Sequence, residues 1–394
     1  MITPVYADRV SNMKGSVIRE LLKLTEQPDI ISFGGGLPSP DSFPVEKIQE
    51  ITDSILGSSL ATKVLQYSTT EGLVDLREWI AGYVKERGIS ASHSDVLILS
   101  GSQQGIELIS KVMLNPGDVV LVERPTYLTA INVFKAYQAD IRSVESDEFG
   151  IIPEKLEEAI IANKPKFVYL IPTFQNPSGV TLTKERRIKV MEILTRYKVV
   201  AVEDDPYGAL RYSGEDIPYL KSYDTEGLCV MLGSFSKVVA PGLRVGYAVA
   251  APALLSKMVI AKQGVDMHTS VLSQKIIAEF GNKGYFHPHV QSIKDNYKVK
   301  RDLMLTEMEK HFPEGSKWNR PDGGLFIWCV LPAGIDTPTL LEECTAQKVA
   351  FIPGSPFFVD GTGNDSMRLN FSNATHEKIS FGIEKLGSII KSKL

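Results

Sequence analysis

The fold is decided by two stretches of the sequence, Val199-Val-Ala-Val-Glu-Asp-Asp-Pro-Tyr207 and Cys229-Val-Met-Leu-Gly-Ser-Phe-Ser-Lys237. In each, a continuous run of apolar residues leads directly into polar and charged residues. Apolar runs without alternation are typical of β-strands that are buried on both faces of a sheet. The chain contains further runs of this kind, and we expect strands at Val96–Leu99, Val119–Val122, Phe167–Ile171, Val199–Val202, Cys229–Leu232 and Val245–Val249.

Helical patterns separate several of these strands, at Gln103–Leu114, Thr126–Tyr137, Pro153–Ala162 and Thr183–Tyr197. The last pattern begins with Thr183, a residue type that favours helix N-caps. Strands that alternate with helices predict an α/β fold, in which a mostly parallel sheet is sandwiched by helices. Ligands of such sheets bind beyond the carboxyl ends of the strands.

The sequence changes character after about residue 290, where a long charged helix (Ile293–His311) precedes several short strands. A chain of 394 residues also exceeds the roughly 250–300 residues at which a single core stops growing. We therefore expect a smaller α+β domain in addition to the large one. The predicted division is an N-terminal segment (1–45) that packs with the small domain, a large domain (46–290) and a small C-terminal domain (291–394).

The composition excludes several classes of protein. The 43 basic and 47 acidic residues give a formal net charge of −4, whereas nucleic-acid-binding proteins usually carry a marked basic excess. The three cysteines fit neither a disulfide framework nor a zinc pattern, so we expect no metal. No apolar run approaches the roughly 18 residues of a membrane span, and the N-terminus does not resemble a signal peptide. We expect a cytoplasmic protein.

Polar residues follow several of the predicted strands. Ser102 and Gln103 come after Val96–Leu99 and open a helix, whose free N–H groups could bind an anion. The alternative is that Ser102 simply caps this helix. Asn176 follows Phe167–Ile171 within Asn-Pro-Ser-Gly, a sequence that indicates a turn whether or not it forms a site.

The two opening stretches end in the residues with the most reactive chemistry. Three acids follow Val202, and because side chains alternate along an extended segment, Asp204 should point away from Glu203 and Asp205. These acids could instead be solvated at the strand tip. Lys237 follows the other strand among Ser234, Ser236 and Arg244, and hydroxyls with a cation are typical of phosphate binding. A lone lysine in a loop is otherwise an ordinary surface residue.

Taken together, these elements resemble the pyridoxal-phosphate aminotransferases of fold type I, class I/II. The Asn-Pro-Ser-Gly, Asp-x-x-Tyr, Ser-x-x-Lys and downstream Arg elements occur in the order of that family, and the likeness runs from about Lys14 to the C-terminus. The branch it is most similar to contains 2-aminoadipate, kynurenine and aromatic aminotransferases. The segments that carry this closer likeness are Ser16–Leu24, Phe33–Pro38, Gln66–Ser68, Gly101–Gln104, Gly233–Lys237 and Arg368–Phe371.

The resemblance implies a role for each of these residues around a bound pyridoxal 5'-phosphate. Lys237 would form a Schiff base with the cofactor aldehyde and would transfer protons in a ping-pong reaction. Asp204 would pair with the pyridine N–H, Asn176 and Tyr207 would donate hydrogen bonds to the ring oxygen, and Tyr127 would stack on the ring. For Tyr127, a place in the apolar core is an equally good interpretation.

The resemblance also implies how phosphate and substrate are held. The residues implied around the phosphate are Ser102, Gln103, Ser234, Ser236, Arg244 and Tyr67, the last contributed across the interface of a homodimer. Arg368 would bind the α-carboxylate of the substrate, with Gly36 and Asn176 beside it. Ser16 and Arg19 would bind the distal carboxylate of acidic substrates, although Arg19 could also be a solvated helix residue. The implied substrates are 2-aminoadipate, glutamate and aromatic or other bulky apolar amino acids, with a 2-oxo acid such as 2-oxoglutarate as acceptor.

Three other functions are alternatives to that of a pyridoxal-phosphate aminotransferase. A pyridoxal-phosphate lyase that performs β-elimination would share the fold and is the main alternative. A DNA-binding regulator with an aminotransferase-like domain would need a basic N-terminal extension, and the likeness here already begins at about Lys14. A nicotinamide dehydrogenase would need a G-x-G-x-x-G turn after a strand, and Gly34–Gly36 departs from that pattern.

Overall fold

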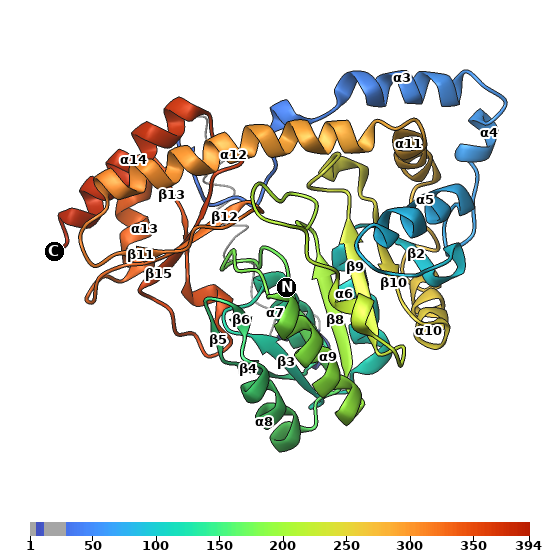
Figure 1. Ribbon diagram of the computed structural model, residues 1–394, viewed down its shortest axis with the longest axis horizontal. Coiled ribbons are helices and arrows are strands. Elements are labelled where there is room, and N and C mark those ends of the chain that lie inside the picture. The colour runs from blue at the N-terminus through green and yellow to red at the C-terminus, as the bar shows by residue number, and fades with distance from the viewer. Residues whose placement is uncertain (1–4, 12–28) are drawn as a thin grey trace.

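The computed structural model describes residues 5–11 and 29–394, and its centre is a sheet of seven strands (Figure 1). The strand order is β2-β10-β9-β8-β7-β3-β4. Every neighbouring pair is parallel except those that β10 makes with β2 and β9. The expected mostly parallel sheet is therefore confirmed. Its strands are β2 (Val96–Leu99), β3 (Val119–Glu123), β4 (Asp140–Val144), β7 (Phe167–Leu170), β8 (Val200–Asp205), β9 (Cys229–Ser234) and β10 (Gly246–Val249).

Helices cover both faces of this sheet because alternate strand residues point to opposite sides. Val202, Val230 and Leu232 pack with residues of α6, α7 and α10, whereas Val168 and Ala201 pack with residues of α8 and α9. Thr183 caps α9 as predicted, since its side chain accepts a hydrogen bond from the N–H of Arg186. The bounds of these helices are α6 (Ser102–Met113), α7 (Leu128–Ala136), α8 (Pro153–Asn163), α9 (Lys184–Tyr197) and α10 (Pro252–Gln263).

A second sheet lies toward the C-terminus, with four antiparallel strands in the order β11-β12-β15-β14. Helices α12 and α14 pack against each other along this part of the molecule (Figure 1). The elements are α12 (Phe286–His311), β11 (Lys317–Trp318), β12 (Phe326–Val330), α13 (Thr337–Ala346), β13 (Val349–Ala350), β14 (Ile352–Pro353), β15 (Ser366–Asn370) and α14 (His376–Lys391). The described part of the N-terminal segment joins them, because β1 (Ile31–Ser32) pairs with β13.

Helix α12 is longer than predicted and runs without a break through residue 290. It begins at Phe286 because this ring is buried and packs edge-on against Trp79, 5.0 Å away between centroids. The helix thus contacts elements of the large sheet region as well as the smaller one, and the domain division near residue 290 stays a prediction. The remaining elements are α1 (Asp8–Ser11), α3 (Val45–Leu56), α4 (Ala61–Val64), α5 (Val74–Lys85), α11 (Val271–Asn282), β5 (Ser146–Asp147) and β6 (Gly150–Ile151).

The register of the large sheet brings distant residues to one edge. Gly246 pairs with both Leu99 and Ser234, so the segments that follow β2 and β9 and the one that precedes β10 meet there. Asp204 pairs with Leu232 on the neighbouring strand. In the described ranges, 5–11 and 29–394, no helix is long and apolar enough to cross a membrane.

Candidate active site

Lys237 lies three residues beyond the end of β9, in the loop that leads to β10. Its Nζ donates a hydrogen bond to the carbonyl oxygen of Gly36, at 2.8 Å. Burial, followed by the positive charges of Arg368 and Arg244, lowers the pKa of Lys237 to about 8. The amine is therefore enclosed and loses its proton far more readily than an ordinary surface lysine does.

The three acids after Val202 belong to strand β8 and are buried, so the alternative of a solvated tip is wrong. Their partners confirm the predicted alternation. Glu203 accepts from the backbone N–H groups of Leu220 and Lys221, and Asp205 forms an ion pair with Arg87 at 3.4 Å. The third acid, Asp204, faces the site.

Asp204 has only one of its two carboxyl oxygens occupied by a described partner. Oδ2 accepts a hydrogen bond from the hydroxyl of Tyr169 at 2.7 Å, whereas Oδ1 is buried and has no partner among the described residues. Burial raises the pKa of Asp204 to about 7, against a smaller opposing effect of the Tyr169 hydrogen bond. An unpaired buried acceptor of this kind is costly, which points to a ligand that donates to it.

Asn176, in a turn that follows β7, and Arg368, on β15, meet in the same site. The guanidinium of Arg368 on β15 donates to Asn176 Oδ1 at 2.8 Å and to the Gly34 carbonyl oxygen at 2.7 Å. Its Nε is buried and has no described partner. Burial lowers the pKa of Arg368 to about 10, so it stays cationic at neutral pH.

Two tyrosines complete this group. The hydroxyl of Tyr207 lies 3.5 Å from Asn176 Nδ2, and burial raises its pKa well above 10, so that it stays protonated. Tyr127 precedes α7, and burial followed by the charge of Asp204 raises its pKa. Arg368 and Arg244 also act on the titration of Tyr127, so all three charged groups lie within electrostatic range of its hydroxyl.

The residues proposed for the phosphate gather where the sheet register predicts. Gly101, with a φ of 89°, is the N-cap of α6, and Ser102 is its first residue, so Ser102 does not cap this helix. Only glycine adopts such a backbone without strain, and Ser102 thereby keeps a free N–H at the helix start. Arg244 donates to the Ser100 carbonyl oxygen at 3.1 Å, and the N–H of Ser236 donates to Ser234 Oγ at 3.2 Å.

A substitution at Gly246 tests the proposed phosphate site, because the structure leaves no room for a side chain at this position. A Cβ at this position would lie 2.7 Å from the Ser102 nitrogen and 2.8 Å from the Gly233 oxygen. We expect Gly246→Ala to push β10 away from β9 and from the start of α6, and to weaken cofactor retention by about tenfold or more. Cofactor release on dialysis measures this, with Gly242→Ala as the matched control because a Cβ there meets nothing within 4 Å. Equal retention by both variants would contradict it.

The remaining predicted residues are less enclosed or lie elsewhere. Gln103 has an exposed side chain, and Tyr67 is 79% exposed, with its ring edge-on to His268 at 5.9 Å between centroids. Gly36 contributes the carbonyl that accepts from Lys237. Ser16 and Arg19 fall outside the described residues.

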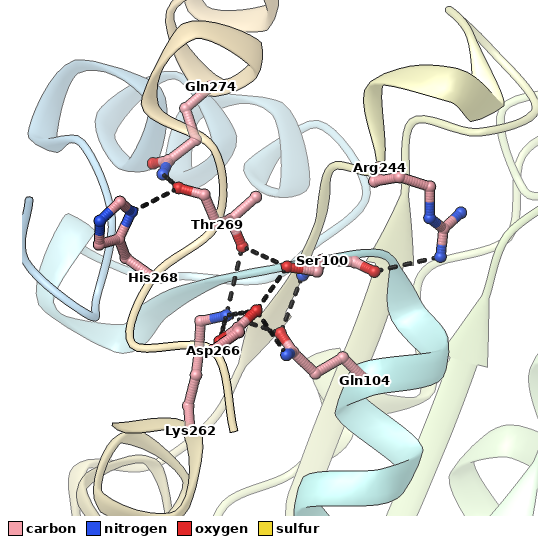
Figure 2. Close-up of polar contacts among 8 residues, drawn as sticks. All are labelled: Ser100, Gln104, Arg244, Lys262, Asp266, His268, Thr269 and Gln274. Carbon is pink, nitrogen blue, oxygen red and sulfur yellow. Dashed lines mark hydrogen bonds and ion pairs between the residues drawn. The ribbon is translucent and has the colours of Figure 1, made fainter. Parts of the chain in front are cut away.

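Several polar residues near the site have no recognisable signal in the sequence. Tyr169 looked like a core residue of β7, yet its hydroxyl binds Asp204. Gln104, Lys262 and Asp266 form a polar cluster behind the Ser100–Ser102 segment (Figure 2). The partners of this cluster are far apart in sequence, so no local pattern could reveal them. Among the residues described, no group of three or more His, Cys, Asp or Glu side chains could hold a metal ion.

Comparisons with known proteins agree with this geometry. The family "Aminotransferase class I and II" matches residues 28–386. An aromatic-amino-acid aminotransferase of Thermococcus litoralis is 44% identical, over 99% of this chain and 94% of its own. The structure of the kynurenine aminotransferase of Pyrococcus horikoshii superposes with a TM-score of 0.95 at 43% identity, covering 99% of this chain and 97% of that one.

A third relative was solved with a cofactor derivative in place. The α-aminoadipate aminotransferase of Thermus thermophilus, complexed with N-(5'-phosphopyridoxyl)-L-leucine, has a TM-score of 0.91 at 36% identity and covers 98% of this chain and 97% of its own. Each of these matches spans nearly the whole of both chains. The chain therefore belongs to the class I and II aminotransferases, with the fold of the type I enzymes, and is a transferase that depends on pyridoxal 5'-phosphate.

Proposed function

We propose that this enzyme moves an amino group from 2-aminoadipate, glutamate or a bulky apolar or aromatic amino acid to a 2-oxo acid such as 2-oxoglutarate. The observation that carries this proposal is the buried Arg368, whose guanidinium is held by Asn176 and Gly34 and stays cationic beside the enclosed amine of Lys237. Relatives named for 2-aminoadipate, kynurenine and aromatic substrates support this range of amino donors.

The residues present fit the cofactor. The unpaired Asp204 Oδ1 suits a ring N–H, and the phosphate suits the N–H groups at the start of α6 together with Ser234, Ser236 and Arg244. Tyr127 would lie against the ring. When bound, pyridoxal 5'-phosphate supplies an aldehyde that links to amines and a ring that withdraws electrons from the substrate α-carbon.

Lys237 has the properties that proton transfer requires. Its pKa of about 8 makes a substantial fraction of the amine neutral near neutral pH, whereas a free lysine with a pKa of about 10.4 would be almost fully protonated. Lys237 Nζ would take a proton from the substrate α-carbon and deliver it to the aldehyde carbon of the cofactor. Tyr207 and Asn176 would donate hydrogen bonds at the ring oxygen, and the ionised Asp204 would hold the ring nitrogen in its protonated form.

Arg368 would set the orientation of the substrate. A guanidinium binds a carboxylate through two parallel hydrogen bonds, and this fixes the direction in which the α-carbon presents its hydrogen. The rings of Phe326 and Phe357 lie 4.1 Å and 5.2 Å from the guanidinium carbon and exclude water from it. The charge of Arg368 is therefore weakly screened, which strengthens its attraction for the substrate.

We expect Arg368→Lys to lower kcat/KM by about 10–100-fold for every amino donor, because the ammonium cannot reproduce the two-pronged contact. A panel of 2-aminoadipate, glutamate and phenylalanine, with 2-oxoglutarate as acceptor, measures this loss. Arg19→Ala in the same panel should reduce only the two acidic donors, in keeping with its proposed contact to a distal carboxylate. Equal loss on all three donors in Arg19→Ala would contradict that contact. An unchanged kcat/KM in Arg368→Lys would contradict the proposed binding of the α-carboxylate by Arg368.

The proposal includes a homodimer in the cytoplasm. The side chain of Tyr67 is 79% exposed, and nearby Leu65 is 72% exposed, so both are accessible to a partner subunit. A partner subunit would cover them, and Tyr67 would reach the phosphate of the partner's cofactor. The division into a large domain and a small domain is part of the same proposal, with the substrate between Lys237 of one and Arg368 of the other.

A further inference from the structure

A buried ion pair lies behind the proposed phosphate site. Lys262, near the end of α10, has a side chain with 0% exposure. Its ammonium contacts both carboxyl oxygens of Asp266, at 2.7 Å and 3.0 Å, and donates to Gln104 Oε1 at 2.7 Å and to Thr269 Oγ1 at 3.3 Å (Figure 2). Removing the ammonium of a lysine from water costs free energy. A buried ion pair with this many short hydrogen bonds therefore indicates a role beyond packing.

The cluster contacts one residue in particular, Ser100, which begins the turn that follows β2. Asp266 Oδ2 accepts from Ser100 Oγ at 2.7 Å and from Gln104 Nε2 at 2.8 Å. Gln104 Oε1 accepts from the Ser100 N–H at 2.9 Å. The third polar group of Ser100, its carbonyl oxygen, accepts from Arg244 at 3.1 Å, as Figure 2 also shows. The nitrogen, hydroxyl and carbonyl of Ser100 are thus all held at once.

The hydrogen bonds of Ser100 are important because the next residue, Gly101, is a glycine and has the widest backbone freedom. Gly101 has a φ of 89°, and a Cβ on it would lie 2.5 Å from a terminal nitrogen of Arg244. Glycine gives the turn its shape but does not restrict it, since glycine populates many conformations. The hydrogen bonds to Ser100 supply the restriction, and they fix the direction in which the α6 N-terminus and Arg244 face the phosphate.

We propose that Lys262 and Asp266 are positioning residues for the cofactor phosphate, which act by holding Ser100 and, through it, Arg244 and the first N–H groups of α6. The inference rests on the phosphate site of the proposed function. Burial raises the pKa of Asp266, but hydrogen bonds from Lys262, Ser100 and Gln104 together outweigh it and keep the pKa below its ordinary value. Asp266 is therefore a carboxylate, able to accept from all of these groups at neutral pH.

The cluster also fixes the segment that follows it. Thr269 Oγ1 contacts Ser100 Oγ at 3.1 Å, and its carbonyl oxygen accepts from Gln274 Nε2 at 2.8 Å. His268 Nδ1 lies 2.9 Å from the same oxygen, and the His268 ring borders Tyr67. One ion pair thus holds both the phosphate turn and the surface on which Tyr67 rests.

The test compares the affinity of the full-length apoenzyme for pyridoxal 5'-phosphate with its affinity for pyridoxal, which lacks the phosphate. We expect Lys262→Met to raise the dissociation constant for the phosphate form about tenfold and to leave that for pyridoxal nearly unchanged. Asp266→Asn keeps the shape but loses acceptor capacity, and we expect the same selective effect. Asp266→Asn also tests the positioning role if Lys262→Met does not fold.

A matched control separates positioning from stability. Lys221 forms a comparably buried pair with Asp224 at 3.3 Å, but at the opposite end of β9, where it donates to the carbonyl oxygen of Cys229. Lys221→Met should lower the melting temperature without changing the ratio of the two dissociation constants. If Lys262→Met and Asp266→Asn weaken both ligands equally, their role is structural and the proposal is overturned.

The variant Arg244→Gln distinguishes a failure of the phosphate site from a failure of the positioning role of Lys262 and Asp266. It should lower the preference for the phosphate form strongly, because this side chain would contact the phosphate itself. A normal preference in Arg244→Gln would overturn the phosphate site, and the positioning role with it. A normal preference in the Lys262 and Asp266 variants, beside a reduced one in Arg244→Gln, would overturn the positioning role alone.

Discussion

Transamination is expected to be lost when Lys237 is replaced by alanine, with kcat falling by at least about 10⁴-fold. The variant loses both the amine that links to the cofactor and the base that moves the α-proton, and no other amine among the described residues donates to the Gly36 carbonyl. Steady-state rates with glutamate and a 2-oxo acid measure the loss. The visible absorbance of lysine-linked cofactor should disappear at the same time.

Lys237→Arg is the control that isolates the protonation state. A guanidinium keeps the positive charge and can still donate to Gly36, but it does not become neutral at any accessible pH. It should therefore be nearly as inactive as the alanine variant. Substantial turnover in either variant would refute the assignment of Lys237 and with it the proposed mechanism.

The second large effect is expected for Asp204→Asn, which should lower kcat by about 10²–10³-fold and yet stabilise the cofactor-free enzyme. Activity falls because an amide cannot hold the ring nitrogen protonated. Stability rises because the buried carboxylate, unpaired at Oδ1, is replaced by a neutral group. A pKa raised from 3.8 to about 7 corresponds to about 4 kcal/mol of destabilisation above pH 7.

The pH dependence of this stabilisation has a definite direction. Because the pKa of Asp204 is higher in the folded protein, the folded state binds this proton more tightly than the unfolded chain does. Its contribution to stability is therefore fully present below about pH 4 and is lost as the pH rises through about 7. Melting curves of the two apoenzymes should separate over this range and run parallel above it. A constant difference from pH 4 to 8 would contradict the raised pKa.

Much of the site followed from local rules in the sequence. The alternation of side chains along a strand was enough to separate Asp204 from Glu203 and Asp205, whose partners indeed lie elsewhere. The position of Lys237 after an apolar strand placed it at the edge where ligands bind. The other site residues were predicted from the family resemblance, because no local pattern connects Arg368 with Asn176, 192 residues away.

Other features depended on tertiary contacts that no short window contains. Ser102 looked like a helix cap, but the close approach of Arg244 and β10 selects a glycine conformation at Gly101 and moves the cap there. Lys262 is buried because Asp266 pairs with it and because Gln104, 158 residues away, accepts a hydrogen bond from it. Strand β8 continues through its acids because Arg87, Tyr169 and backbone N–H groups neutralise or bind them.

The reversed direction of β10 has a consequence for engineering this enzyme. Because β10 runs opposite to β9, a single connection of eleven residues, Phe235–Val245, leaves and re-enters the same edge of the sheet, and carries both Lys237 and Arg244. The proposed reactive amine and the proposed phosphate ligand therefore lie on the same short connection. Grafting this connection into another scaffold would transfer both, whereas lengthening it to enlarge the substrate space would disturb both.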